Sequence, residues 1–192
     1  LHDLMASIGR PMGDCGHTTP LRHLLAARAL PPGALCAHMN ELDADDLQAL
    51  RDLPDGFLHI VHCPASHRYF GHSPFRMREL REAGITVCLG TDSLASAPTL
   101  NLFHELRVAR EAYPWLAERE LLEMVTVHAA RAIGQAAMRG KIAPGHAADL
   151  IAVPDPGGEP HRAVVDHRGP VRWAMVAGRE SRLAEPPATP SL

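Results

Sequence analysis

Short apolar runs alternate with amphipathic stretches along the first two thirds of the chain, and this alternation predicts strands separated by helices. The runs at 34–39, 57–63 and 85–92 are typical of buried strands, and the last is nearly continuous and β-branched. Strands that alternate with helices imply parallel pairing with right-handed crossovers. The pattern fits a barrel and a doubly wound sheet alike, and periodicity alone does not choose between them.

Helix-start residues precede several of the amphipathic stretches. Thr19 and Asp43 are capping residues placed just before such stretches, and Pro20 suits a first helical position. Ser73 and Pro74 repeat this signal further along the chain. We expect helices that begin at these caps or follow the third strand, over residues 19–30, 43–53, 73–84, 100–112 and 117–133.

After Gly140 the pattern changes to short strand-like runs broken by proline and glycine, with no helix predicted between them. The runs are KIAPGHAADLIAVP, RAVVDH and VRWAMVAGRE. We therefore predict an α/β unit over residues 1–139, a small β-rich segment over 140–182 and a disordered tail over 183–192.

Length and composition limit the class of protein. With 46% hydrophobic and 21% charged residues, the chain has the composition of a folded protein with a core. A complete eight-stranded β/α barrel takes about 250 residues, so these 192 residues hold only part of one.

Charge and hydropathy argue against some partners. The formal net charge is -3, and no run of lysine and arginine forms the basic stripe that nucleic acids or anionic lipids attract. No stretch of about 18 apolar residues is present, and the first ten residues do not resemble a signal peptide. We expect a cytoplasmic protein that acts on a small molecule, without nucleic-acid or membrane partners. A homo-oligomer is left open.

Histidines and cysteines indicate different chemistry. The four cysteines are widely spaced without a CxxC pair, which is typical of reduced thiols, whereas 13 histidines suggest site chemistry. His38, His62 and Asp92 each end one of the predicted strands. Because the carboxyl ends of parallel strands meet at one edge, we expect these three side chains to converge on one mouth. Imidazole and carboxylate there favour zinc or iron, although a satisfied hydrogen-bonding or surface role is the alternative for each histidine.

Long segments around these residues resemble the amidohydrolase superfamily, in particular its metal-dependent deaminases and chlorohydrolases. AHMNELDADDLQAL and VHCPASHRYFGHSPFRMRELREAG are similar to the sixth- and seventh-strand segments, and GITVCLGTDSLASAPTLNLFHELRVAR to the last strand and its loop. GKIAPGHAADLIAV is similar to the signature at which the chain leaves the barrel. The resemblance covers roughly residues 1–180. It implies the C-terminal part of a (β/α)8 TIM-type barrel followed by a small β-sandwich segment.

The resemblance also implies residue roles. Asp92 would be a metal ligand and the base that accepts a proton from the attacking water, and His38 would contact the substrate and assist catalysis. His67 stands where many relatives have asparagine, and we expect it to contact the substrate. Ser93 and Ser96 are expected to cap a helix or shape the pocket rather than act as nucleophiles, because no base lies next to them in the sequence.

The implied function is hydrolysis of a C–N bond, with deamination of an aminopurine-like or other nitrogen heterocycle by a metal-activated water. Zn²⁺ is expected, with Fe²⁺ as the alternative. HCPASHRYFGHSPF and CLGTDSLAS most resemble aminodeoxyfutalosine-type and related purine-nucleoside deaminases. Dechlorination of a similar heterocycle is the alternative reaction.

The family's metal site also takes a His-x-His pair from the first barrel strand and a histidine from the fifth, and neither motif occurs in this sequence. A catalytic zinc takes about three protein ligands, so we expect the chain alone to be inactive and the activity to belong to a parent enzyme. Too few strands to close a barrel would leave apolar faces and a sheet edge exposed. The alternative is a truncated, inactive relative that serves as a structural or interaction module. An isolated phosphate-binding domain is disfavoured because no glycine-rich phosphate loop follows any strand.

Overall fold

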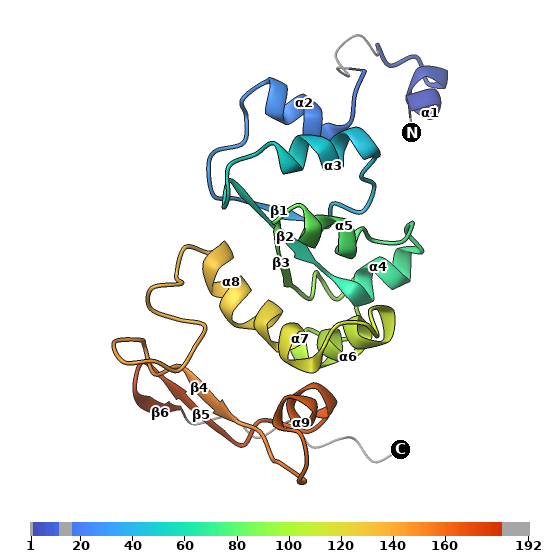
Figure 1. The fold of residues 1–192 in the computed structure, drawn as a ribbon. Coiled ribbons are helices and arrows are strands. Elements are labelled where there is room, and N and C mark those ends of the chain that lie inside the picture. The colour runs from blue at the N-terminus through green and yellow to red at the C-terminus, as the bar shows by residue number, and fades with distance from the viewer. Residues whose placement is uncertain (1, 12–16, 182–192) are drawn as a thin grey trace, which may run out of the picture.

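A parallel three-stranded sheet organises the computed structural model, which describes residues 2–11 and 17–181 (Figure 1). Its strands are β1 (Ala34–Ala37), β2 (Leu58–His62) and β3 (Thr86–Leu89), and β2 pairs in parallel with both neighbours. Each strand falls within an apolar run expected from the sequence, and the predicted parallel pairing is confirmed. Within the described residues β1 and β3 are edge strands, so this sheet does not close into a barrel by itself.

Helices surround the sheet in the described part of the chain, and α7 and α8 pack directly on β3 (Figure 1). The helices of the described part of the chain are α1 (His2–Ser7), α2 (Pro20–Ala26), α3 (Ala44–Arg51), α4 (Pro64–Phe70), α5 (Met77–Glu82), α6 (Leu102–Ala112), α7 (Glu118–Val125), α8 (Val127–Ala132) and α9 (Pro160–Asp166), of which α1 and α9 lie away from the parallel sheet (Figure 1). Among the described residues, none of the helices is long and apolar enough to cross a membrane.

Two predicted helix starts are confirmed. The Thr19 hydroxyl accepts a hydrogen bond from the backbone N–H of Arg22 (3.4 Å) at the start of α2. At the start of α3, the Asp43 carboxylate accepts from the N–H of Asp46 (2.8 Å), and the Asp46 carboxylate accepts from the N–H of Asp43 (3.1 Å). These bonds satisfy N–H groups that have no partner inside the helix, so local chemistry fixes where both helices begin.

The helix expected over 73–84 begins later than predicted. The residue that precedes α5 is Arg76, and Ser73 does not cap the helix. Phe75 is buried and stacks on the ring of His62 with 4.0 Å between ring centroids. We attribute the error to this long-range packing, because burying an aromatic ring outweighs a capping bond of about 1 kcal/mol.

Two further errors concern helices near the sheet. Helix α4 directly follows β2 and was not predicted, although Pro64 is at its first position and Gly71 ends it with a left-handed φ of 64°. The single helix expected over 117–133 is two helices, α7 and α8. They are separated at Thr126, whose hydroxyl donates to the carbonyl of Leu122 (2.7 Å).

A second, antiparallel sheet follows the α/β part and consists of β4 (Leu150–Ala152), β5 (Trp173–Val176) and β6 (Arg179–Ser181). It agrees with the β-rich character expected after Gly140. The prediction that no helix occurs there was wrong, because most of RAVVDH lies in α9. Pro160 occupies the first turn of α9, the Glu159 carboxylate accepts from the N–H of Arg162 (2.7 Å), and Val165 is fully buried. The predicted disordered tail, 183–192, lies outside the described residues.

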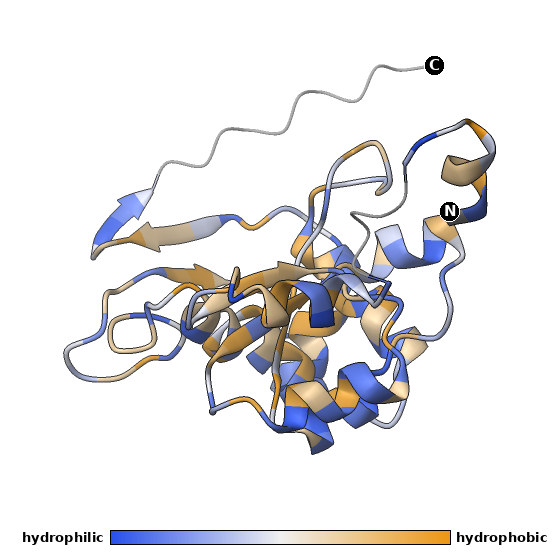
Figure 2. Cartoon of the chain, turned by 90° about the horizontal axis from the view of Figure 1, so that it is seen from above, coloured by the Kyte–Doolittle hydropathy of each residue, from blue (hydrophilic) through white to orange (hydrophobic). Residues whose placement is uncertain are grey.

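The main core lies between the sheet and its helices. Figure 2 shows hydrophobic residues along the strands and on the helices beside them. The most deeply buried large apolar side chains are Leu50, Leu58, Ile60, Met77, Leu80, Leu106 and Leu121. The side chain of Leu35 on β1, by contrast, is 50% exposed. One face of the edge strand β1 is therefore uncovered, as expected for too few strands to close a barrel.

A buried carboxylate on α3 allows a first prediction. Asp46 has no exposed surface and accepts hydrogen bonds from the Thr19 hydroxyl and from Nε of Arg22 (3.2 Å). We expect Asp46→Ala to lower the free energy of unfolding by about 3 kcal/mol, because it leaves the Thr19 hydroxyl and the N–H of Asp43 without their acceptor. Asp45→Ala on the same helix is the matched control, since the Asp45 side chain is 77% exposed, and should cost under about 1 kcal/mol. Urea denaturation of both variants measures the difference. Equal losses would contradict the prediction.

Candidate active site

Two of the predicted site residues meet at the carboxyl edge of the parallel sheet. His38 directly follows β1, and Asp92 follows β3 by three residues. The imidazole Nε2 of His38 lies 4.0 Å from Oδ2 of Asp92. Their side chains are 42% and 27% exposed, so both are open to a ligand. The expected convergence of these two side chains on one mouth is confirmed.

The backbone at both positions has an uncommon conformation. The φ angles are 69° at His38, 52° at Met39 and 57° at Asp92, all in the left-handed region. Such residues cost on the order of 1 kcal/mol each, and non-glycine examples are concentrated at functional sites. The backbone N–H of His38 donates to the carbonyl of Val61 (2.8 Å), which fixes the turn beside the neighbouring strand.

Two serine hydroxyls hold the carboxylate of Asp92. Ser66 Oγ donates to Asp92 Oδ2 at 2.7 Å, and Ser96 Oγ donates to the same oxygen at 2.8 Å. Both serines are buried. These bonds hold the pKa of Asp92 below its usual value, with the Ser66 hydroxyl as the largest cause and the charge of His38 as a smaller one. Asp92 is therefore kept ionised, as a ligand for a cation must be.

Ser66 was missed by the sequence analysis, and Ser96 was expected only to cap a helix or shape the pocket. The available signal for Ser66 was Pro64, which marks the start of α4 two residues earlier. Recognising that helix would have placed Ser66 in its first turn, beside the carboxyl ends of β2 and β3. The hydroxyl of Ser96 is a hydrogen-bond donor to Asp92, in agreement with a supporting rather than a nucleophilic role.

His62 does not line the mouth, and this expectation was wrong. Its side chain is 1% exposed, with Nε2 2.8 Å from the hydroxyl of Tyr113 and its ring stacked on Phe75. Successive residues of a strand point to opposite faces, and the face that carries His62 also carries Ile60 of the core. Burial lowers the pKa of His62 to about 3, with smaller contributions from the charges of the neighbouring histidines. His62 is therefore a neutral core residue.

His67 lies on α4, within reach of His62 but without a hydrogen bond to Asp92 in the described part of the chain. Its Nε2 lies 3.0 Å from the carbonyl oxygen of Ser73, so this nitrogen carries the proton and donates. Its ring centroid is 5.3 Å from that of His62. Burial lowers the pKa of His67, which favours the neutral ring. Its contact with substrate stays a prediction.

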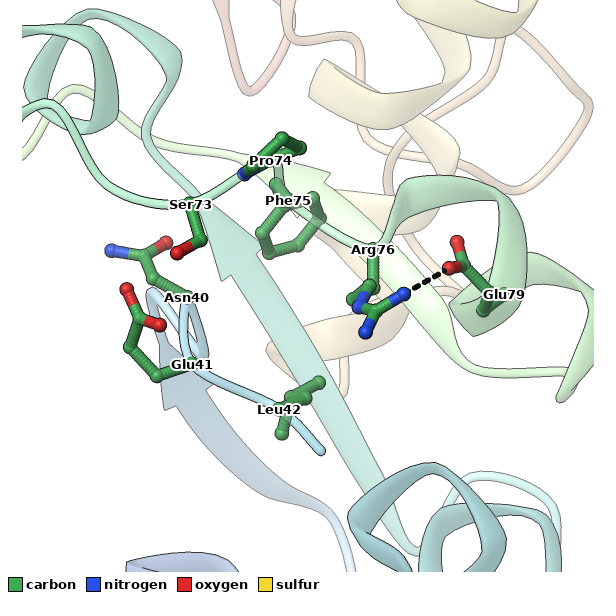
Figure 3. Close-up of a pocket in the computed structure, with 8 residues that line it drawn as sticks. All are labelled: Asn40, Glu41, Leu42, Ser73, Pro74, Phe75, Arg76 and Glu79. Atoms are coloured by element: carbon green, nitrogen blue, oxygen red, sulfur yellow. Dashed lines mark hydrogen bonds and ion pairs between the residues drawn. The ribbon is translucent and has the colours of Figure 1, made fainter. Parts of the chain in front are cut away.

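A cavity of about 490 Å³ opens between the loop after β1 and the loop before α5 (Figure 3). Its lining consists of Asn40, Glu41, Leu42, Ser73, Pro74, Phe75, Arg76 and Glu79. Figure 3 shows Glu41 and Ser73 at one end and the Arg76–Glu79 ion pair, 2.9 Å long, at the other. Asn40 follows His38 by two residues, so the cavity adjoins the loop that carries His38.

The described residues do not form a complete metal site by themselves. Asp92 offers an ionised, partly exposed carboxylate with the imidazole of His38 near it. A protein zinc site takes three or four ligands from nitrogen, sulfur and oxygen donors. Among residues 2–11 and 17–181, no three histidine, cysteine or acidic side chains are grouped so that they could hold one ion. A zinc site that included Asp92 would therefore need ligands from outside the described residues.

Comparison with known proteins supports one family. The model of the amidohydrolase family matches residues 7–180. A 5-methylthioadenosine/S-adenosylhomocysteine deaminase from Teredinibacter turnerae is 30% identical over 160 residues, which is 80% of this chain and 35% of that protein. An aminodeoxyfutalosine deaminase from Deinococcus radiodurans is 32% identical over 133 residues, or 69% of this chain and 31% of that protein. The chain thus spans about a third of the length of these curated relatives.

Solved structures include a similar fold. An adenosine deaminase from Xanthomonas campestris with bound zinc superposes with a TM-score of 0.76 at 24% identity. The match covers 93% of this chain and 42% of that one. Both the parallel and the antiparallel parts of the chain therefore occur together as a portion of a larger known fold.

Proposed function

The chain belongs to the amidohydrolase family, and from this premise we propose that it forms part of a hydrolytic deaminase that acts on an aminopurine-like or other nitrogen heterocycle. The observation that carries the proposal is the Asp92 carboxylate, which is fixed by two serine hydroxyls and lies 4.0 Å from the imidazole of His38. The names of the similar deaminases agree with this reaction class. Because this chain matches only about a third of the length of these relatives, the activity is proposed for the complete enzyme.

We assign the proton chemistry to Asp92 and His38. Asp92 accepts the proton of the attacking water at a carboxylate oxygen, and His38 donates a hydrogen bond to the group under attack. The lowered pKa of Asp92 makes it a weak base on its own. It can accept that proton only if the water is made more acidic than bulk water.

A bound divalent metal would supply that acidity, since zinc lowers the pKa of water to about 7. We propose Zn²⁺, with Fe²⁺ as the alternative, and Asp92 as the ligand that this chain contributes. The remaining ligands must come from outside the described residues, because no group of three candidate ligands is present within them.

We further propose that the barrel of the complete enzyme includes residues 1–139 and that residues 140–182 form part of a β-sandwich. His67 would contact the substrate at the same edge of the sheet, and the cavity lined by Asn40 and Glu41 would face the part of the substrate that is not attacked. The adjacency of this cavity to the loop of His38 supports that placement.

Ammonia release is the test of the proposed function. We expect the natural protein, purified from its source and loaded with Zn²⁺, to release ammonia from one or more aminopurine nucleosides. The 192-residue chain alone should show no turnover and should bind Zn²⁺ weakly in a competition titration with a chromophoric chelator. Measuring the intact mass of the natural protein against 20.8 kDa shows whether further sequence supplies the ligands.

Two outcomes would overturn this assignment. Release of chloride from a chlorinated heterocycle, with no ammonia from any aminopurine, would favour the dechlorination reaction. No turnover by the natural zinc-loaded protein, at an intact mass of 20.8 kDa, would favour a truncated relative that serves as a structural or interaction module.

A further inference from the structure

A fully buried acid lies behind the candidate active site. Glu105 on α6 has no exposed surface, and its Oε2 accepts a hydrogen bond from the backbone N–H of Ala65 at 2.9 Å. Its other oxygen, Oε1, is buried without a hydrogen-bond partner in the described part of the chain. A buried acid with one unsatisfied oxygen costs stability, so its presence calls for a role that an apolar side chain would not fill.

The hydrogen bond from Ala65 replaces a missing helix cap. Helix α4 begins after Cys63, which makes no capping bond with its side chain, and Pro64 has no N–H to satisfy. The N–H of Ala65 is the next one in the first turn, and the carboxyl group of Glu105 accepts it from a different helix. The first turn of α4 is thereby tied to α6.

The residue after Ala65 is Ser66, whose hydroxyl donates to Asp92 at 2.7 Å. Asp92 and Glu105 are also joined along the chain by the loop before α6, in which Ser96 gives Asp92 its second hydroxyl. Hydrogen bonds therefore link Glu105 to the first turn of α4 and that turn to Asp92, and the chain from Asp92 to Glu105 closes the loop. This arrangement fixes the direction from which Ser66 reaches Oδ2 of Asp92.

We propose that Ser66 is a positioning residue that holds the Asp92 carboxylate in one orientation, and that Glu105 keeps Ser66 in place by capping α4. Both hydroxyls are on Oδ2, the same oxygen that lies 4.0 Å from Nε2 of His38. The role of this orientation in catalysis rests on the proposed function, whereas the orientation of the carboxylate does not depend on it.

The side-chain rotamer of Asp92 tests the proposal without any enzyme assay. Three-bond couplings from its backbone nitrogen and carbonyl carbon to Cγ, measured by NMR on the 192-residue chain, report χ1. We expect a single rotamer in the wild type and averaged couplings in Ser66→Ala. Ser93→Ala is the matched control, because the exposed hydroxyl of Ser93 belongs to the same loop and makes no bond to the Asp92 carboxylate among the described contacts. A single rotamer in Ser66→Ala at an unchanged Tm would overturn the proposal.

Variants of Glu105 test the second part. Glu105→Gln retains a carbonyl oxygen for the N–H of Ala65, whereas Glu105→Leu removes the acceptor at similar volume. We expect the rotamer of Asp92 to be retained in the first variant and averaged in the second. A single Asp92 rotamer in both variants would overturn the role of Glu105. If Glu105→Leu does not fold, the hydrogen-exchange rate of the Ala65 N–H in Glu105→Gln is the deciding measurement. Protection of that N–H equal to the wild type is expected, and its loss with an unchanged Asp92 rotamer would also overturn the role.

In the complete enzyme, Ser66→Ala should weaken Zn²⁺ binding by about 10- to 100-fold, as is typical when a group that orients a ligand is removed. If the Asp92 rotamer depends on Ser66 but no deaminase activity is found, the proposed function fails and the positioning role stands. If the enzyme is an active deaminase and the rotamer does not change in Ser66→Ala, the positioning role fails and the proposed function stands.

Discussion

Asp92→Asn should lower kcat/KM for deamination by the complete enzyme by about 10³-fold or more, with little change in Tm. The substitution removes the charge and the proton-accepting capacity of the carboxylate, and general-base catalysis together with metal binding contributes at least this much. Asparagine is preferable to alanine at this position, because the φ of 57° is one that asparagine tolerates and alanine resists. The amide oxygen can also still accept the hydroxyls of Ser66 and Ser96.

Steady-state kinetics with ammonia detection and a thermal unfolding scan give the two readouts. Asp55→Asn is the matched control, since Asp55 is an exposed carboxylate that precedes β2 and so lies near the opposite edge of the sheet. We expect this control to keep full activity. Retention of more than about a tenth of the activity in Asp92→Asn would mean that the carboxylate is neither the base nor a required ligand.

The positions of His38 and Asp92 were predictable because they depend on local rules. Each residue follows an apolar run that forms a strand, and parallel strands present their carboxyl ends at the same edge. The alternation of strands and helices therefore suffices to bring the two side chains together. The capping residues Thr19 and Asp43 are equally local, and both helix starts were found where they were predicted.

The errors arise where contacts between distant segments decide the structure. Ser73 and Pro74 form a good helix start, yet the packing of Phe75 on His62 delays α5 until Met77. His62 ends a strand just as His38 does. Successive residues of a strand point to opposite faces of the sheet, and the side chain of His62 lies on the face that packs into the core. Neither the alternation nor the capping pattern contains that information.

The partners of Asp92 were also beyond the sequence pattern. Ser66 and Glu105 are 39 residues apart in the sequence, and only the packing of α4 against α6 brings the carboxyl group of Glu105 to the first turn of α4, next to Ser66. A lone buried glutamate in an amphipathic helix resembles a surface residue when it is considered by sequence alone. Its burial is explained by the start of α4, which has no side-chain cap of its own and whose Ala65 N–H donates to Glu105.

Mild acid should destabilise the chain through His62. The folded protein keeps this ring neutral, with a pKa of about 3, because the core around Tyr113 and Phe75 excludes water. In the unfolded chain the pKa of histidine is about 6.5. Above pH 6.5 the ring is neutral in both states and has no pH-dependent effect on stability. As the pH falls below 6.5, the unfolded chain binds a proton that the folded chain does not bind until about pH 3, so folding becomes less favourable.

The expected loss from His62 is about 2 kcal/mol of unfolding free energy between pH 7.5 and pH 5. Urea denaturation at the two pH values measures it as the difference between the wild type and His62→Gln, whose amide can still pair with the hydroxyl of Tyr113. The variant should be less stable than the wild type at pH 7.5 but should lose about 2 kcal/mol less on acidification. His23→Gln on the exposed side of α2 is the matched control and should show the pH dependence of the wild type. A pH dependence in His62→Gln that equals the wild type would contradict the prediction. It would show that His62 is protonated inside the folded core, and that the interior between β2 and α6 admits charge or water.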